Sequence, residues 1–318
     1  MISHFRSIWL ADSMNLRFRI RRFSSFLLDI SSEYINTTKC RNQKELAEKM
    51  KNKLTTKEAY TSFQAIDRAL FLPKTEYREP YVNEPQNLGF SEATLSTPYH
   101  HALILSILHE TGLKSGKRVI DIGCGSGYLT AAIYRTVGKT GLVVGMERIP
   151  ELVNMAKTCL KDCPITKEAQ DDGSLKVIDA YDERGNWTIA RYKPYDIIHV
   201  GFSFNPDDSK SIEVLTSCLR QNEESRMLAG FGEYLCLFDH KGYRKEIASI
   251  PGMAKFQQGK YQKVQTRGER IKEIKDKLDA WKSDFEGTHG RKPNKEDMFS
   301  DETSRALFQE FSGLTKLS

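Results

Sequence analysis

The feature that most constrains this chain is a glycine-rich segment, GCGSG at residues 123–127, placed between a strand pattern and a helix pattern. Residues 118–122 form an apolar run rich in β-branched side chains, which is typical of a parallel strand buried on both faces. Residues 128–137 follow with apolar side chains at helical spacing. A strand, a glycine loop and a helix in this order begin a doubly wound α/β unit.

The flanking sequence extends this unit. The patterns predict strands at residues 141–147, 175–179 and 195–200 and helices at residues 42–54, 57–70 and 149–160, with a further helix from Pro98 to near Gly112. Residues 72–90 contain several prolines and a glycine, so we expect an ordered loop there. The expected fold is α/β, a doubly wound Rossmann-like domain.

The order of the glycines indicates the kind of ligand that the loop would approach. Dinucleotide enzymes use G-x-G-x-x-G, whereas this loop reads D-x-G-x-G-x-G, with Asp121 followed by Gly123, Gly125 and Gly127. That order suits a ligand without phosphate, an adenosine joined to an amino-acid moiety. Glu147, at the end of the second strand, is placed to accept hydrogen bonds from the ribose hydroxyls. A tight turn that binds no ligand is the alternative.

Several motifs in order resemble those of protein-L-isoaspartate O-methyltransferases. The resemblance covers residues 44–201, about half of the chain. Its motifs are AIDR at 65–68, PYVNEPQ at 80–86, ATLSTP at 93–98, VIDIGCGSGYLTA at 119–131, GKTGLVVG at 138–145, ELV at 151–153 and PYDIIHVG at 194–201. This family has the class I S-adenosylmethionine-dependent methyltransferase fold, so the resemblance implies that fold and that cofactor.

The resemblance also implies an activity and a set of site residues. The implied activity is methyl transfer from S-adenosylmethionine to isoaspartyl carboxylates in proteins or peptides, with Ser96 as the catalytic hydroxyl and no metal. The residues implied to line the cofactor are Thr94, Leu95, Ser96, His101, Asp121, Gly123, Gly125, Ser126, Glu147, Arg148, Asp179 and Ala180. Two simpler roles remain open, because Ser96 could be only a helix N-cap and His101 could pack on the following helix.

Three departures from the family's pattern fall near the implied site. Asp179 lies between Ile178 and Ala180, where the family has glycines. The segment FSFNP at 202–206 replaces a small alanine-rich loop, so we expect its aromatic bulk where a substrate peptide would lie. The segment RQNEESR at 220–226 replaces a proline-glycine-glycine turn. The alternative function is therefore a methyltransferase-like scaffold subunit of a larger protein assembly, with catalysis reduced or lost.

Both ends of the chain depart from the compact enzyme pattern. Residues 1–41 form a basic amphipathic arm, for which a mitochondrial transit peptide is the alternative. Residues 42–255 form the methyltransferase-like domain, and residues 256–318 form a helical extension. Within the extension we expect an amphipathic helix at 268–285, a break at 288–293 and a second helix from about 294. Residues 281–297 are similar to a short helix–turn–helix segment that mediates association in unrelated eukaryotic proteins.

The composition indicates which partners, metals and cellular compartments to expect. Hydrophobic residues make up 39% and charged residues 28%, and no apolar stretch approaches the roughly 20 residues that a membrane span needs. The net charge of +6 comes largely from the two ends, so nucleic acid is not an expected partner. Six cysteines without C-x-x-C spacing favour a reducing compartment and no structural zinc. We expect a cytoplasmic protein without a membrane span, which binds an isoaspartyl substrate and, through both arms, a large intracellular assembly. A mitochondrial location is the alternative.

Overall fold

The computed structural model describes residues 40–74, 79–90, 93–205, 209–249 and 267–315. The chain divides into two compact units, Met1–Tyr261 and Gln262–Ser318. Nearly all of the arm predicted at residues 1–41 and the boundary predicted at 255/256 lie outside the described residues. Among the residues that are described, no helix has the length and apolar character needed to cross a membrane.

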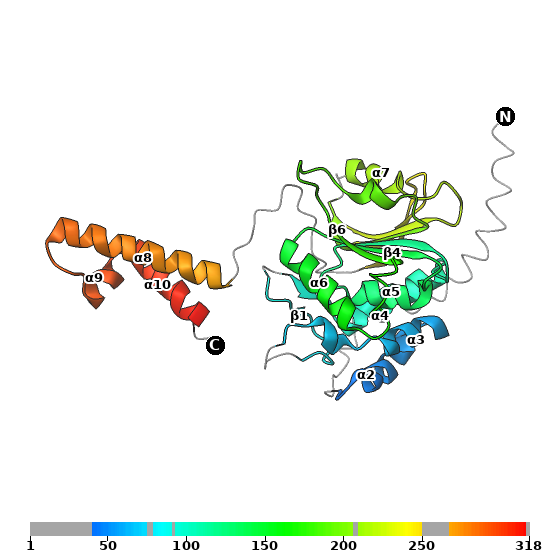
Figure 1. Cartoon of the computed structure of the whole chain (residues 1–318), viewed down its shortest axis with the longest axis horizontal. Helices are drawn as coiled ribbons and strands as arrows, with labels where there is room; N and C mark the ends of the chain where they lie inside the picture. The colour runs from blue at the N-terminus through cyan, green and yellow to red at the C-terminus, as the bar shows by residue number, and fades with distance from the viewer. Residues whose placement is uncertain (1–39, 75–78, 91–92, 206–208, 250–266, 316–318) are drawn as a thin grey trace. The chain divides into compact units, whose positions relative to one another are not determined.

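The first unit is built around a seven-stranded sheet (Figure 1). Its strands are β3 (Arg118–Ile122), β4 (Leu142–Glu147), β5 (Leu175–Asp179), β6 (Ile197–Phe204), β7 (Arg226–Phe231), β8 (Tyr234–Phe238) and β9 (Arg244–Ser249). The spatial order is β5-β4-β3-β6-β7-β8-β9. The first five strands of this order are parallel, β8 is antiparallel to β7, and β9 is antiparallel to β8. The predicted α/β doubly wound sheet is confirmed. Its strand order reverses between β3 and β6, because β4 and β5 extend the sheet on one side of β3 and β6 and β7 extend it on the other.

Helices cover both faces of this sheet, as Figure 1 shows. The helices of the first unit are α2 (Gln43–Met50), α3 (Lys57–Ala65), α4 (Pro98–Glu110), α5 (Tyr128–Val137), α6 (Pro150–Asp162) and α7 (Ser209–Thr216). Val119 and Val143 belong to the hydrophobic core formed with α4, α5 and α6, whereas Ile120 and Val144 belong to the core on the α7 face. Successive strand side chains point to opposite faces, so the continuous apolar run of each central strand serves both cores.

The predicted N-terminal helices form and begin at hydrogen-bonding caps. The side chains of Asn42, Thr56 and Thr97 accept hydrogen bonds from the main chain of the first turns of α2, α3 and α4. A short 3₁₀ helix, η2 (Arg68–Phe71), follows α3, and the predicted loop then contains the two-residue strand β1 (Gln86–Asn87). That strand pairs with β2 (Thr94–Leu95) immediately before α4.

Strand β6 differs from the prediction, because it continues to Phe204 instead of ending at residue 200. A register shift between Val200 and Ser203 lets the strand bend and resume its pairing with β7. Phe204 is consequently 1% exposed in the core on the α7 face, and the ring of Phe202 packs edge-on against it at 5.2 Å. The prediction that aromatic side chains of this segment lie on the substrate side is therefore wrong for Phe204, because β6 directs that side chain into the core.

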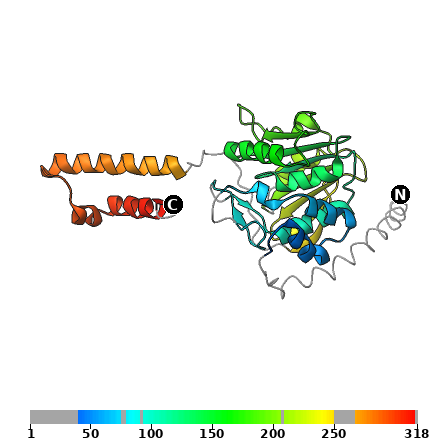
Figure 2. The same ribbon diagram turned by 60° about the horizontal axis from the view of Figure 1, so that its bottom comes forward.

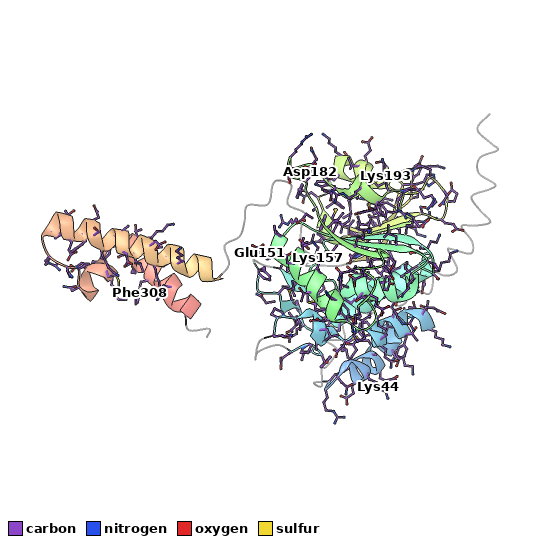
Figure 3. The ribbon with its side chains drawn as sticks, in the orientation of Figure 1. Lys44, Glu151, Lys157, Asp182, Lys193 and Phe308 are labelled. Atoms are coloured by element: carbon purple, nitrogen blue, oxygen red, sulfur yellow. The ribbon has the colours of Figure 1, made fainter. Side chains whose placement is uncertain are left out.

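The described part of the second unit is helical (Figure 2). Its helices are α8 (Arg267–His289), α9 (Lys295–Ser300) and α10 (Glu302–Thr315). Ile274 and Leu278 form the buried stripe of α8, and Phe308 of α10, labelled in Figure 3, packs edge-on against Phe299. The single helix predicted after residue 294 is instead interrupted at Asp301, because its carboxylate caps the next helix through Ser304 N at 2.7 Å.

Asp196 lies at the end of the sheet opposite the glycine loop, where its hydrogen bonds connect β3, β6 and β7. Its carboxylate accepts hydrogen bonds from Arg118 N and Arg220 Nε, both at 2.8 Å. Its main chain bonds Arg118 O at 2.7 Å and Arg226 N at 3.1 Å. Burial opposes ionisation here, but these hydrogen bonds and the nearby cations outweigh it, so the pKa of Asp196 lies below its ordinary value.

We expect Asp196→Asn to lower the free energy of unfolding by about 1 to 3 kcal/mol, because the amide places donors against the Arg118 and Arg220 donors. Urea unfolding at pH 7 measures the change. Glu224→Gln is the matched control, since Glu224 also pairs with Lys117 but is exposed, and its effect should stay below about 1 kcal/mol. Equal losses in the two variants would contradict the assigned role of Asp196.

Candidate active site

The predicted site residues gather at the carboxyl ends of the central strands. Gly123 follows β3, Glu147 ends β4, Asp179 ends β5, and Gly201 lies in the bend of β6. Glu147 and Asp179 are register partners on neighbouring strands. Ligands of open α/β sheets bind outside this edge, where the strand order reverses, so the arrangement marks the edge as the candidate active site.

The glycine loop adopts a backbone that only glycine takes readily. Gly123, Gly125 and Gly127 have φ values of 76°, 56° and 90°. A Cβ at Gly127 would approach Leu160 of α6 at 3.2 Å, and a Cβ at Gly123 would approach the Phe202 ring at 3.3 Å. Between them the hydroxyl of Ser126 is buried without a hydrogen-bond partner. The loop therefore brings its backbone close to its surroundings and retains one unused buried polar group.

Glu147 is joined directly to this loop. Its Oε2 accepts a hydrogen bond from Gly125 N at 3.0 Å, and its Oε1 accepts from Arg148 N at 2.7 Å and Ile149 N at 3.2 Å. Burial raises the pKa of Glu147, although these amides favour its ionised form. Since a carboxylate offers about four acceptor positions, roughly one remains on Oε2. Contact of Glu147 with the ribose hydroxyls stays a prediction.

Asp121 lies below the loop with both carboxylate oxygens engaged. Oδ1 accepts a hydrogen bond from His199 Nδ1 at 2.7 Å, and Oδ2 accepts from Thr130 Oγ1 at 2.6 Å. The side chain is 1% exposed. Asp121 thus joins β3 to β6 and to α5, while the buried Nε2 of His199 has no hydrogen-bond partner. Direct contact of Asp121 with a cofactor stays a prediction.

Ser96 lies just before α4 and is half-buried. The helix N-cap is Thr97, whose hydroxyl accepts from His100 N at 3.0 Å, so the simpler role considered for Ser96 is wrong. The main-chain carbonyl of Ser96 accepts a hydrogen bond from the guanidinium of Arg68. The Ser96 hydroxyl is therefore not used for capping α4.

His101 is buried between η2 and the start of α5. Its Nδ1 bonds Arg68 NH1 at 2.9 Å, and its ring lies 4.8 Å from that of Tyr128, measured between centroids. Burial, followed by the charge of Arg68, lowers the pKa of His101 well below its ordinary value. The ring is consequently neutral at pH 7, with Nδ1 as acceptor. The packing role that the sequence left open is present, and contact with a cofactor stays a prediction.

The remaining predicted residues are distributed along the same edge. Thr94, Arg148 and Asp179 are exposed, while Leu95 and Ala180 are buried. Ala180 continues regular main-chain pairing, donating to Glu147 O at 2.8 Å and accepting from Thr188 N at 3.0 Å. The presence of alanine where the family has glycine had suggested a restricted backbone beside Asp179. The regular pairing of Ala180 shows that its side chain does not disturb this backbone.

Sequence reasoning assigned no role to Arg68, Thr130 or His199. Arg68 and His199 lie within the motifs AIDR and PYDIIHVG, but a motif does not reveal which way a side chain points. The register of β3 and β6 sets His199 opposite Asp121, and parallel pairing of those two strands was the signal that could have linked them.

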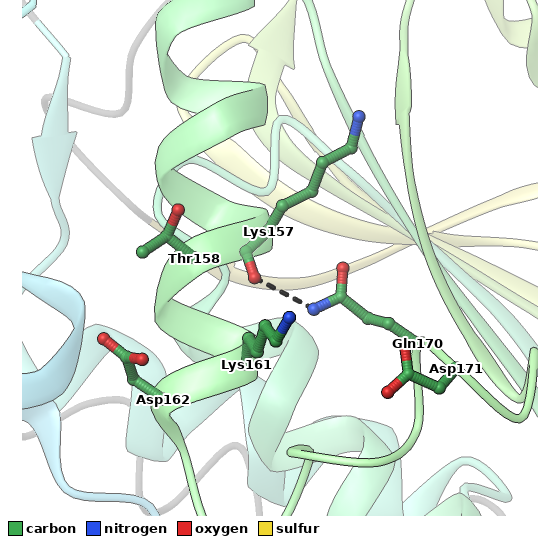
Figure 4. Close-up of a pocket in the computed structure, with 6 residues that line it drawn as sticks. All are labelled: Lys157, Thr158, Lys161, Asp162, Gln170 and Asp171. Carbon is green, nitrogen blue, oxygen red and sulfur yellow. Dashed lines mark hydrogen bonds between the residues drawn. The ribbon is translucent and has the colours of Figure 1, made fainter.

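A shallow hollow of about 270 Å³ lies elsewhere, between α6 and the turn that follows it (Figure 4). Its lining is polar and exposed, and the amide of Gln170 closes one side by donating to Lys157 O at 2.9 Å. It contains none of the predicted site residues, so we do not assign the reaction to it. Within the described ranges, no group of three or more metal-binding side chains occurs.

The buried histidines predict how stability depends on pH. Burial, then the charge of His199, lowers the pKa of His100 to about 4, whereas an unfolded histidine titrates near 6.5. The unfolded chain therefore takes up more protons as pH falls from about 6.5 to about 4, and the folded state loses up to about 1.4 kcal/mol per pH unit for each such histidine. Urea unfolding across this range should give a smaller slope for His100→Gln. An unchanged slope would contradict a lowered pKa of His100 in the folded state.

Comparison with known proteins agrees with this geometry. The family model described as protein-L-isoaspartate(D-aspartate) O-methyltransferase (PCMT) matches residues 41–209. Protein-L-isoaspartate O-methyltransferase 1 of Arabidopsis thaliana is 39% identical over 163 residues, which cover 50% of this chain and 66% of that protein. The corresponding protein of Methanococcus aeolicus is 35% identical over 165 residues, covering 51% and 67%. The matched part of this chain thus covers about two thirds of the length of the Methanococcus aeolicus protein and slightly less than two thirds of the Arabidopsis thaliana protein.

Solved structures agree on the fold. The PCMT of Plasmodium falciparum, in complex with S-adenosyl-L-homocysteine, has a TM-score of 0.58 at 25% identity, covering 69% of this chain and 100% of that one. A second protein-L-isoaspartate O-methyltransferase has a TM-score of 0.51 at 22% identity, covering 73% and 70%, and supports the fold alone. The expected class I methyltransferase fold is confirmed. With its family model matching more than half of its length, the chain belongs to the protein-L-isoaspartate(D-aspartate) O-methyltransferase family.

Proposed function

We propose that this chain transfers a methyl group from S-adenosylmethionine to the free carboxylate of isoaspartyl residues in proteins or peptides. The observation that carries the proposal is the bond between Gly125 N and Glu147 Oε2, which joins the glycine loop to the acid of the next strand in a member of this family. This pairing assembles, at one edge, a backbone without side chains and a carboxylate that accepts hydroxyl protons.

The described residues fit S-adenosylmethionine. Gly123 is exposed and has no side chain to obstruct an amino-acid moiety. The unused hydroxyl of Ser126 and the remaining acceptor position on Glu147 Oε2 are polar groups that a nucleoside with an amino-acid tail can satisfy. Asp179, exposed on the neighbouring strand, would lie beside the base. These residues would bind the cofactor, which when bound supplies an electrophilic methyl group on its sulfonium.

The chain's own residues have to orient a nucleophile that is already active. A carboxylate with an ordinary pKa near 4 is ionised at neutral pH, so no general base is required. The Ser96 hydroxyl, which α4 does not use as its cap, can donate to one carboxylate oxygen and direct the other toward the methyl group. Alignment of this kind can supply about 7 to 11 kcal/mol of the barrier reduction.

The scaffold alternative depended on aromatic bulk at residues 202–206. Phe204 packs in the core on the α7 face, so its ring does not occupy the substrate side. Phe202 packs against Phe204 and borders the glycine loop, because a Cβ at Gly123 would lie 3.3 Å from its ring. A larger assembly that binds the terminal arms remains a prediction about partners, separate from the activity. The C-terminal helices support it only in forming a compact unit of their own.

We expect Ser96→Ala to lower kcat/KM for an isoaspartyl peptide about tenfold to a hundredfold, because a hydrogen bond to the reacting carboxylate is lost. Methyl incorporation from labelled cofactor measures this. Ser115→Ala is the control, since Ser115 is exposed before β3 and its hydroxyl bonds that of Thr140 at 3.3 Å. Wild-type inactivity despite cofactor binding would instead favour the scaffold.

We expect Glu147→Gln to raise the dissociation constant for S-adenosylmethionine about tenfold to a hundredfold, because a charged acceptor becomes a neutral amide. Isothermal titration calorimetry measures this, with Glu168→Gln as a control in an exposed ion pair. Since the pKa of Glu147 is raised, wild-type affinity should also weaken as pH falls. Unchanged affinity in Glu147→Gln would remove Glu147 from the cofactor site.

A further inference from the structure

Arg68 is a fully buried cation whose hydrogen bonds, among the described residues, are all to neutral groups. Its side chain is 0% exposed, and it is the first residue of η2. NH1 bonds His101 Nδ1 at 2.9 Å, and NH2 donates to the carbonyl of Leu95 at 3.3 Å and to that of Ser96. Nε is buried without a hydrogen-bond partner. No ion pair found among the described residues includes Arg68.

A buried charge without a counter-charge is costly, and it is rarely kept without a reason. Burial lowers the pKa of Arg68 to about 10, so the guanidinium remains charged at neutral pH. The adjacent Asp67 does not pair with it, because the Asp67 carboxylate accepts from Ala69 N at 2.9 Å and from Tyr81 Oη at 2.8 Å. The Tyr128 ring, 5.5 Å from Arg68 Cζ, gives only partial compensation.

The surrounding histidines do not supply the missing negative charge. His101 accepts from Arg68 and is neutral, and the pKa of His100 is also lowered by burial. Within the described part of the chain, the cationic charge therefore lies next to the Ser96 segment without an anion to balance it. Its two carbonyl contacts also fix the peptide groups on both sides of Ser96.

We propose that Arg68 is a positioning residue of the methyl-acceptor site, which sets the Ser96 segment and favours an anionic acceptor whose carboxylate supplies the missing negative charge. This inference rests on the proposed function, because that function identifies Ser96 with the acceptor site. Arg68 acts through the Ser96 main chain and through its field. In a low-dielectric interior such a field is screened weakly.

The test compares an isoaspartyl peptide with the same peptide carrying a neutral carboxamide at the reacting position. Both are titrated into the full chain saturated with S-adenosylhomocysteine, so binding is measured without turnover. The variants are Arg68→Met, which removes the charge, and Arg68→Lys, which keeps it. Arg118→Met is the matched control, because the Arg118 guanidinium also donates to two main-chain carbonyls, those of Pro194 and Tyr192, at the opposite end of β3.

We expect the wild type to bind the anionic peptide about tenfold to a hundredfold more tightly than the neutral one. Arg68→Met should abolish this preference and leave cofactor affinity within about threefold. Arg68→Lys should keep the preference, and its kcat should fall because an ammonium cannot reproduce the fork that contacts both carbonyls. Arg118→Met should alter the melting temperature without altering the preference.

A preference for the anionic peptide that survives in Arg68→Met would overturn the inference, as would its absence in the wild type. If Arg68→Met does not fold, a loss of the preference in soluble Arg68→Lys would overturn it equally. Failure of the proposed function has a different signature. The wild type would then discriminate between the two peptides by charge and still transfer no methyl group to the anionic one.

Discussion

The candidate site depends on the buried carboxylate of Asp121. Its two oxygens bind the imidazole of His199 on β6 and the hydroxyl of Thr130 on α5, while its own backbone belongs to β3. A buried carboxylate needs such partners, because leaving either oxygen without a donor would cost the desolvation free energy of a charge. The glycine loop begins two residues later. The position of that loop is therefore determined by three elements meeting at one side chain.

A second buried charge, Arg68, contacts the Ser96 segment. Through His101 and the ring of Tyr128 it contacts the first residue of α5, which directly follows Gly127. The Ser96 segment and the glycine loop are thus supported by the same helix start. The proposed reaction requires alignment more than acid–base chemistry. It therefore suits a site in which the Ser96 segment and the glycine loop share one support.

Comparison of prediction and structure shows which residues a sequence pattern can assign. The strand at 118–122, the helix at 128–137 and the acid at the end of β4 were predicted correctly, because hydrophobic periodicity and glycine spacing are local signals. Phe204 was misplaced, since a bend in β6 moved it from an expected loop into the core. His199 was overlooked as a partner for Asp121, because the two are distant in sequence and adjacent only through strand pairing.

The sequence by itself determined the α/β class, the position of the glycine loop and the acid that ends the next strand. These follow from side-chain period, from the backbone freedom of glycine and from the short connections of a doubly wound sheet. Only the tertiary structure decided that Thr97 caps α4, that Asp121 lies beneath the loop and that Arg68 has no anionic partner among the residues the structure describes. Burial and hydrogen bonding depend on what distant segments bring to the same point, and no local pattern of residues encodes that.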